Sequence, residues 1–112
     1  MTAPAEHISE KALMQAVIDL ARLLQYDLYH THDSRRSAPG FPDLLMASKR
    51  GRIGQPNRLI VAELKTERGR LSPQQAEWLK LFEACGVPAY VLRPSDWISG
   101  RIERILTGEE DA

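Results

Sequence analysis

The strongest constraint on the fold of this chain is a pair of short apolar runs that carry ionisable residues at their ends. Residues 40–46 read Gly-Phe-Pro-Asp-Leu-Leu-Met, and residues 61–66 read Val-Ala-Glu-Leu-Lys-Thr. Successive side chains of a strand point to opposite faces, so Glu63 and Lys65 share one face. If the two runs pair as neighbouring strands, Asp43 and Glu63 converge and Lys65 lies beside them.

Two converging carboxylates suit Mg²⁺, which takes oxygen ligands and keeps several of its waters. Such an ion polarises a phosphoryl oxygen and acidifies water, and the ammonium of Lys65 could stabilise that water or the developing negative charge. The pattern therefore predicts a site for phosphodiester hydrolysis. Acids at strand ends are usually solvated, however, and Glu-x-Lys is common by chance, so the flanking sequence has to support this interpretation.

The segment between the two runs predicts how they pair. Residues 49–58 contain two glycines, a proline and an asparagine, which is typical of a hairpin connection longer than a tight two-residue turn. A hairpin makes the two strands antiparallel, and this pairing would bring Asp43 close to Glu63.

Residues 9–24 predict an amphipathic first helix. Its apolar residues recur at spacings of four, three and four, at Leu13, Val17, Leu20 and Leu24, which draws one buried stripe. Ser9 is a suitable N-cap, and Glu10 suits the first turn through the helix dipole. Glu10 also lies along the stripe, so it is either an exposed first-turn acid or an acid that reaches toward the metal site.

Residues 26–31 predict a short strand followed by a polar loop. His30 and His32 alternate onto one face, and a His-x-His pair can bind zinc. No third nitrogen or sulfur ligand is evident, because His7 is remote and Cys85 is isolated. Contact with phosphate near the site is the favoured role for these histidines and for the following Arg35 and Arg36.

The sequence Ser72-Pro73-Gln74-Gln75 predicts the start of a second helix, with Ser at the N-cap, Pro at the first position and Gln75 completing a capping box. The helix should run to about Ala84, with Gly86 just past its end. Gln75 is thus explained by capping alone, but it could also point to the site.

Residues 89–92 predict a fourth strand, and a final short helix should follow with Ser95 or Asp96 as its cap and an interruption at Gly100. Trp97, Ile98, Ile102 and Leu106 are expected to pack onto the sheet. The element order is α-β-β-β-α-β-α, which indicates an α/β fold with a small mixed sheet flanked by helices. We expect one domain over residues 1–112, with about six N-terminal and five C-terminal residues flexible.

Charge is strongly segregated although the formal net charge is zero. Residues 33–70 hold nine basic and four acidic side chains, so this segment carries +5 and the remainder carries −5. A basic region around an acidic pair suits an enzyme that acts on a polyanion, although solubilising charge on loops is the simpler explanation for any single arginine. The expected DNA contacts are His30, His32, Arg35, Arg36, Arg50, Arg52, Arg68 and Arg70.

Composition limits the setting of the protein. One cysteine excludes an internal disulfide framework. No apolar run reaches the length of a membrane span, and the N-terminus lacks the apolar region of a signal peptide. We therefore expect no membrane partner and a cytoplasmic location in a bacterium or a phage-infected host cell.

Taken in order, Gly40-Phe41-Pro42-Asp43, Ala62-Glu63-Leu64-Lys65 and Leu71-Ser72-Pro73-Gln74-Gln75 resemble the VRR-NUC branch of the PD-(D/E)xK nuclease superfamily. The resemblance runs from Glu10 to about Pro94 and departs from the family pattern nowhere in these motifs. The chain is similar to short stand-alone phage-type members. It implies a restriction-endonuclease-like core and cleavage of DNA that depends on Mg²⁺ or Mn²⁺. It also suggests a homodimer acting on branched DNA such as four-way junctions.

The resemblance also implies roles for individual residues. Asp43 and Glu63 correspond to metal ligands, with the main-chain carbonyl of Leu64 as a third. Lys65 corresponds to the catalytic lysine, and Gln75 to the glutamine of the following helix. Glu10 corresponds to an acid found on the first helix of this family and of the similar archaeal Holliday-junction resolvases. Any link between Glu10 and the metal would be indirect.

Two other classes of function are compatible with the sequence. A non-catalytic nucleic-acid-binding module could retain the fold, but it would be free to lose Asp43, Glu63 or Lys65, and all three are present. A purely structural interaction protein would have no evident use for the segregated basic region. A metal-dependent DNA endonuclease is therefore the favoured prediction.

Overall fold

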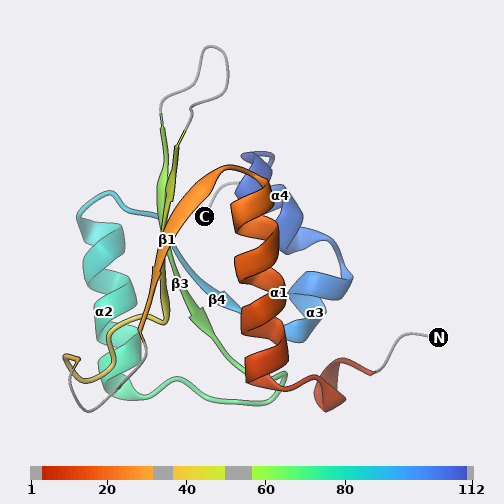
Figure 1. Ribbon diagram of the computed structural model, residues 1–112. Coiled ribbons are helices and arrows are strands. Elements are labelled where there is room, and N and C mark those ends of the chain that lie inside the picture. The colour runs from red at the N-terminus through yellow and green to blue at the C-terminus, as the bar shows by residue number, and fades with distance from the viewer. Residues whose placement is uncertain (1–3, 32–36, 50–56, 111–112) are drawn as a thin grey trace.

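A four-stranded sheet lies between helices on both of its faces in the computed structural model, which describes residues 4–31, 37–49 and 57–110 (Figure 1). The elements in chain order are η1 (Ala5–His7), α1 (Glu10–Leu23), β1 (Tyr26–His30), β2 (Leu44–Ser48), β3 (Leu59–Leu64), α2 (Pro73–Ala84), β4 (Ala89–Leu92), α3 (Pro94–Ile98) and α4 (Arg101–Thr107). This confirms the predicted α/β fold and its element order, with a short 3₁₀ turn added before α1 and the last helical region divided in two.

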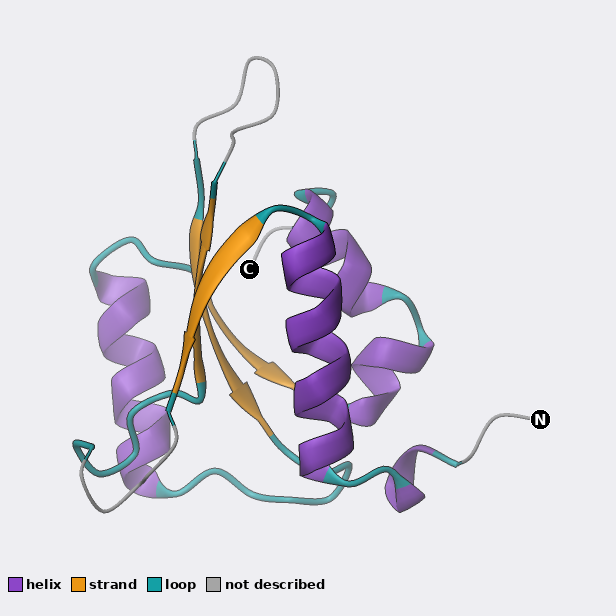
Figure 2. Cartoon of the chain, viewed as in Figure 1, coloured by secondary structure: helices purple, strands orange, loops and turns teal. Residues whose placement is uncertain are grey.

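The sheet is mixed, as expected, with the strand order β1-β2-β3-β4 (Figure 2). β1 and β2 are antiparallel, and so are β2 and β3. β3 and β4 are parallel, because the chain crosses from one to the other through α2, as parallel neighbours require. The architecture is consistent with the core of restriction endonucleases.

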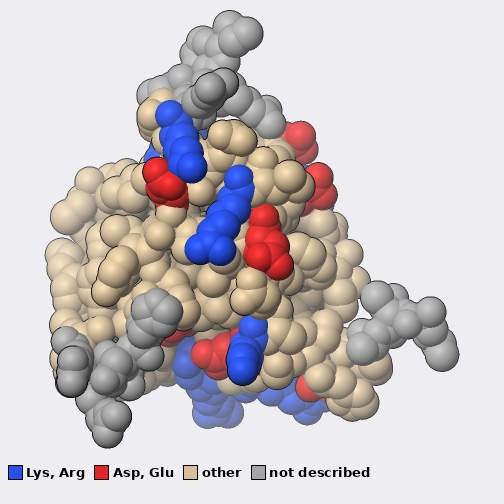
Figure 3. All heavy atoms as spheres, in the orientation of Figure 1, with Lys and Arg blue, Asp and Glu red and all other residues tan. Residues whose placement is uncertain are grey.

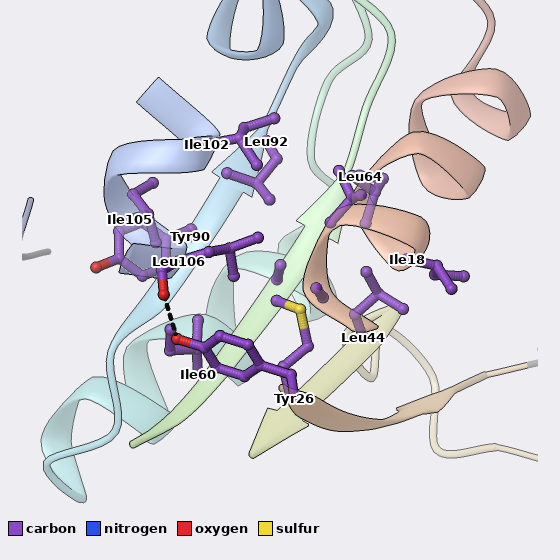
Figure 4. Close-up of a cluster of buried hydrophobic side chains, with 14 of the residues drawn as sticks. Ile18, Tyr26, Leu44, Ile60, Leu64, Tyr90, Leu92, Ile102, Ile105 and Leu106 are labelled. Carbon is purple, nitrogen blue, oxygen red and sulfur yellow. Dashed lines mark hydrogen bonds between the residues drawn. The ribbon is translucent and has the colours of Figure 1, made fainter. Parts of the chain in front are cut away.

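The two faces of the sheet have different coverings, with α2 on one side and α1, α3 and α4 on the other (Figure 1). The main core lies on the second side (Figure 4), where β2 and β3 contribute Leu44, Met46, Ile60, Ala62 and Leu64. At the edge of this core the hydroxyl of Tyr26 donates to the carbonyl of Leu106 at 2.8 Å. Side chains alternate along a strand, so the intervening positions of β2 and β3 project toward α2.

Both long helices begin with the predicted caps. Ser9 Oγ accepts the backbone N–H of Ala12 at the start of α1. The side chains of Leu13 and Val17, on the inner face of this helix, are buried. α2 begins at its predicted cap, Ser72. It ends at Gly86, which has φ +84°, and the N–H of Val87 donates to Phe82 O as in a Schellman motif. No helix within the described residues is long and apolar enough to cross a membrane.

The C-terminal helices differ from the prediction in two respects. The N-cap of α3 is Arg93, and Asp96 is its third residue, whose carboxylate accepts the Arg93 N–H at 2.8 Å. Trp97 and Ile98 are exposed and do not pack onto the sheet, whereas Ile102 and Leu106 do. The reason is that α3 has only five residues, and α4 supplies the apolar face that covers the sheet.

Both ends of the described chain make specific contacts. Residues 5–7 form η1, and the N–H groups of Glu109 and Glu110 donate to Arg104 O. The Glu110 carboxylate also accepts from the guanidinium of Arg101 at 2.6 Å. Flexibility of the outermost residues stays a prediction.

Candidate active site

Asp43, the residue just before β2, lies opposite Glu63 of β3. The antiparallel register pairs Leu44 with Ala62, and one further step along the same register places Asp43 across from Glu63. Directly opposed residues have Cβ atoms about 4.5–5.5 Å apart. The carboxylate of Asp43 is held at this point because its Oδ2 accepts the backbone N–H of Leu64 at 2.8 Å. The hairpin predicted from the sequence thus brings the two acids together on the face that α2 covers.

The segment before Asp43 is fixed against α2 by its glycine and its phenylalanine. Gly40 has φ +80°, and a Cβ at this position would lie 2.5 Å from the backbone of the first turn of α2, so only glycine fits. The ring of Phe41 packs edge-on against Trp78 and Phe82, with centroids 5.0 and 5.9 Å away. Trp78 Nε1 donates to Pro39 O at 3.1 Å. These contacts set the position from which Asp43 enters the site.

Gln75 serves the helix cap and the site simultaneously. Its Oε1 accepts the N–H of Ser72 at 2.8 Å, and its own N–H donates to Ser72 Oγ at 3.1 Å, which completes the predicted capping box. Its Nε2 donates to Glu63 Oε1 at 2.8 Å. The two roles considered for Gln75 in the sequence are therefore compatible, because they use different atoms of one amide.

Glu63 is a buried carboxyl in an unfavourable electrostatic position. Glu63 is 3% exposed and is the one charged residue that is buried among the residues that the structure describes. Burial first, and then the neighbouring carboxylate of Asp43, together raise the pKa of Glu63 to about 8, whereas the charge of Lys65 acts to lower it. Within the described part of the chain, Glu63 Oε2 has no hydrogen-bond partner. A buried oxygen without a donor, beside a second carboxylate, is stabilised by a cation.

Lys65 is the residue that directly follows β3, two positions after Glu63. Its backbone N–H donates to Leu92 O at 3.0 Å, which extends the parallel pairing with β4 by one step. The side chain of Lys65 is half-buried, and its positive charge acts to lower the pKa of Glu63. No described residue accepts a hydrogen bond from its ammonium or forms an ion pair with it, so the group is available to an incoming anion.

A cavity of about 270 Å³ opens over the two acids. It is lined by Thr31, Ser37, Ala38, Pro39, Gly40, Phe41, Asp43, Glu63 and Gln75. Thr31 was not predicted as a site residue. It belongs there because its N–H donates to Asp43 O at 3.0 Å and its hydroxyl to Pro42 O at 3.1 Å, which ties the end of β1 to the start of β2.

The donor set fits a small hard cation. Asp43 and Glu63 offer carboxylate oxygens only, and Mg²⁺ commonly binds one or two carboxylates and completes its shell with water. Among the residues that the structure describes, no group of three or more His, Cys, Asp or Glu side chains is assembled for a metal. The carboxylate oxygens of Asp43 and Glu63 suit Mg²⁺ or Mn²⁺ better than zinc, which prefers nitrogen and sulfur ligands.

Two other predicted site residues lie away from the acids. Glu10 is exposed in the first turn of α1, on the opposite face of the sheet from α2. His30 pairs with Leu44 in the register of β1 and β2, so it projects to the α1 face and away from Asp43. The roles of Glu10 and His30 stay predictions.

The predicted DNA-contacting residues divide into two groups. Arg68 and Arg70 are exposed on the loop between β3 and α2, and Figure 3 shows basic side chains along this lower edge of the molecule. Arg68 forms an ion pair with Glu6 at 3.0 Å, which is weak because both side chains are largely exposed. The predicted contacts at His32, Arg35, Arg36, Arg50 and Arg52 lie outside the described residues.

Comparison with known proteins gives one family. The family model described as the VRR-NUC domain matches residues 4–96 of the 112-residue chain. The matched segment runs from just before η1 into α3 and contains the whole sheet and both acids. No curated protein and no solved structure matches the chain.

Proposed function

The chain belongs to the VRR-NUC domain family of nucleases, and from this we propose that it is a metal-dependent endonuclease that hydrolyses phosphodiester bonds in DNA. The observation that carries the proposal is the opposed pair of Asp43 and Glu63, at the floor of a cavity, with Glu63 Oε2 buried and without a donor among the described residues. A divalent cation would satisfy that oxygen and relieve the repulsion between the two carboxylates.

Asp43 and Glu63 would hold Mg²⁺ or Mn²⁺, and the main-chain carbonyl of Leu64 is the expected third protein ligand. When bound, the ion supplies Lewis-acid polarisation of the phosphoryl group and a water of lowered pKa. Gln75 supports this role by fixing the orientation of the Glu63 carboxylate through Oε1, which leaves Oε2 without a partner among the described residues. The hydrogen bond from Leu64 N–H does the same for Asp43.

Lys65 would stabilise negative charge on the phosphate or orient the attacking water. Its ammonium follows Glu63 by two residues on the same face of the strand line and has no partner among the described residues. A pre-placed cation of this kind is among the most effective contributions to a transition state that gains negative charge. Glu10 would act more indirectly, through water, because α1 lies on the other face of the sheet.

We further propose that the protein acts as a homodimer on branched DNA. One domain of this size carries one such site, whereas resolving a four-way junction takes two cuts in symmetry-related strands, and a two-fold dimer supplies two sites in that relation. In such a dimer, one continuous phosphate-binding face would be formed by arginines of both subunits, namely Arg35, Arg36, Arg50, Arg52, Arg68 and Arg70. Binding of this kind recognises shape and depends steeply on salt.

Cleavage of a substrate panel tests both proposals. Supercoiled plasmid, linear duplex, flap, fork and four-way junction DNA are incubated with the protein in Mg²⁺, in Mn²⁺ and in EDTA. We expect cleavage with either ion, none in EDTA, and the fastest cleavage on the junction, with light scattering giving the mass of a dimer. A monomer that cuts linear duplex as fast as junctions would refute the second proposal alone. Binding in EDTA without any cleavage in either ion would refute the first.

A further inference from the structure

The turn that follows the active-site lysine is held by a single arginine from the end of β4. Three main-chain carbonyls converge on Nη1 of Arg93. They are those of Thr66 at 2.8 Å, Gly69 at 2.7 Å and Glu67 at 3.3 Å. Nη1 has two hydrogens, so the two short bonds are the main ones and the third is shared. The sequence signal for this contact is weak, because Arg93 looks like an ordinary charged residue after a strand.

The same turn is closed from two further directions. The carboxylate of Glu67 accepts the N–H of Ser95 at 3.0 Å, which joins the turn to the first residues of α3. The turn is also compact, since a Cβ at Gly69 would lie 2.9 Å from Thr66 Oγ1 and 3.6 Å from Cδ of Lys65. Gly69 therefore lies close beside the stem of the Lys65 side chain.

We infer that Arg93 is a positioning residue, which fixes Lys65 and, on the same turn, the exposed Arg68 and Arg70. The inference rests on the proposed nuclease function, since it assigns Arg93 its effect through Lys65. Arg93 is suited to this task because a guanidinium carries several N–H donors in a rigid planar fork and has no acceptor. The three carbonyls that accept from Arg93 belong to the four residues that follow Lys65. Their position is therefore linked through the backbone to that of Lys65.

Single-turnover cleavage of junction DNA in Mg²⁺ tests this inference with matched variants. We expect Arg93→Ala to lower the rate about 10- to 100-fold, the scale of a small misplacement of a catalytic group, without changing the affinity for Mn²⁺. Arg93→Lys keeps a cation with three donors and should recover much of the loss. Arg58→Ala is the control, because Arg58 also donates from Nη1 to a main-chain carbonyl, Ile105 O at 2.7 Å, at the opposite end of β3. It should cleave at the normal rate.

A double-mutant cycle separates positioning from general destabilisation. If Arg93 acts through Lys65, Arg93→Ala should cost less than about threefold in a Lys65→Ala background. An equal factor in both backgrounds would overturn the inference. If Arg93→Ala fails to fold, Arg93→Lys and Arg93→Gln complete the same cycle.

Amide hydrogen exchange in EDTA gives a readout that is independent of catalysis. We expect residues 66–70 to exchange faster in Arg93→Ala than in the wild type, with β3 unchanged and with no such effect in Arg58→Ala. Unchanged exchange at residues 66–70 would overturn the inference even if cleavage were impaired. If the wild type cuts no DNA, the proposed function fails, and the exchange result still decides whether Arg93 holds the turn.

Discussion

Replacing Glu63 by glutamine should make the metal-free protein more stable at alkaline pH. The substitution keeps the shape of the side chain and an oxygen that can accept from Gln75 Nε2, but it removes the buried charge. In the wild type, burial and the charge of Asp43 raise the pKa of Glu63 to about 8 from its usual 4.5. The buried charge is therefore a cost that the glutamine variant avoids.

The pH dependence follows from proton binding. Between about pH 4.5 and 8 the folded protein holds a proton at Glu63 that the unfolded chain has released, so the free energy of unfolding falls as the pH rises through this range. One pKa unit corresponds to about 1.4 kcal/mol, which sets an upper limit of roughly 5 kcal/mol for this shift. Water that enters the cavity partly solvates the charge, so we expect about 2–3 kcal/mol.

Urea unfolding in EDTA at pH 5, 7 and 9 measures the effect. The wild type should lose stability across this range, whereas Glu63→Gln should lose much less and exceed the wild type at pH 9. Glu83→Gln is the control, because Glu83 is an exposed carboxylate on α2. Adding Mn²⁺ at pH 8 should reverse the order, by stabilising the wild type alone. Parallel pH profiles for the wild type and Glu63→Gln would refute the reasoning.

Four further predictions concern single side chains. Lys65→Ala should lower the cleavage rate roughly 10²-fold or more with little change in DNA affinity, and an equal loss of both would make the lysine a simple phosphate anchor. Gln75→Ala and Ser72→Ala should each lower the unfolding free energy by about 1 kcal/mol through the lost cap, but only Gln75→Ala should also slow cleavage, and equal rates in the two variants would limit Gln75 to capping. Gly40→Ala should cost about 2 kcal/mol or more in thermal unfolding, because of its positive φ and its contact with α2, and a neutral result would mean that the loop can move away. Glu10→Gln should reduce cleavage partially and leave Mn²⁺ affinity nearly unchanged, so a full loss of metal binding would place the acid in the metal's own shell.

Much of the fold follows from local signals in the sequence. The caps at Ser9 and Ser72, the glycine after α2 and the antiparallel pairing of β2 with β3 all agree with the prediction, because each depends on residues close in the chain. Most of the predicted connection, residues 50–56, lies outside the described residues. The convergence of Asp43 and Glu63 also follows, since the hairpin register and the alternation of side chains determine it.

Contacts between distant segments were not predictable in the same way. Gly40 against the first turn of α2 and Arg93 on the turn after Lys65 join segments more than 20 residues apart, and no local pattern encodes such pairs. The prediction of burial was also wrong where burial depends on how a helix packs. Trp97 and Ile98 looked apolar enough to be buried but lie on a helix too short to cover the sheet.

The most direct test of the account is nicking of supercoiled plasmid by the wild type, Asp43→Ala and Glu63→Gln, each titrated with Mg²⁺. Circular dichroism first establishes that all three proteins are folded. The account predicts nicking by the wild type that rises with Mg²⁺ and stops in EDTA, and no nicking above background by either variant at any concentration of the ion. Near-normal nicking by either folded variant, or nicking by the wild type in EDTA, would contradict the assignment of Asp43 and Glu63 as the metal-holding pair.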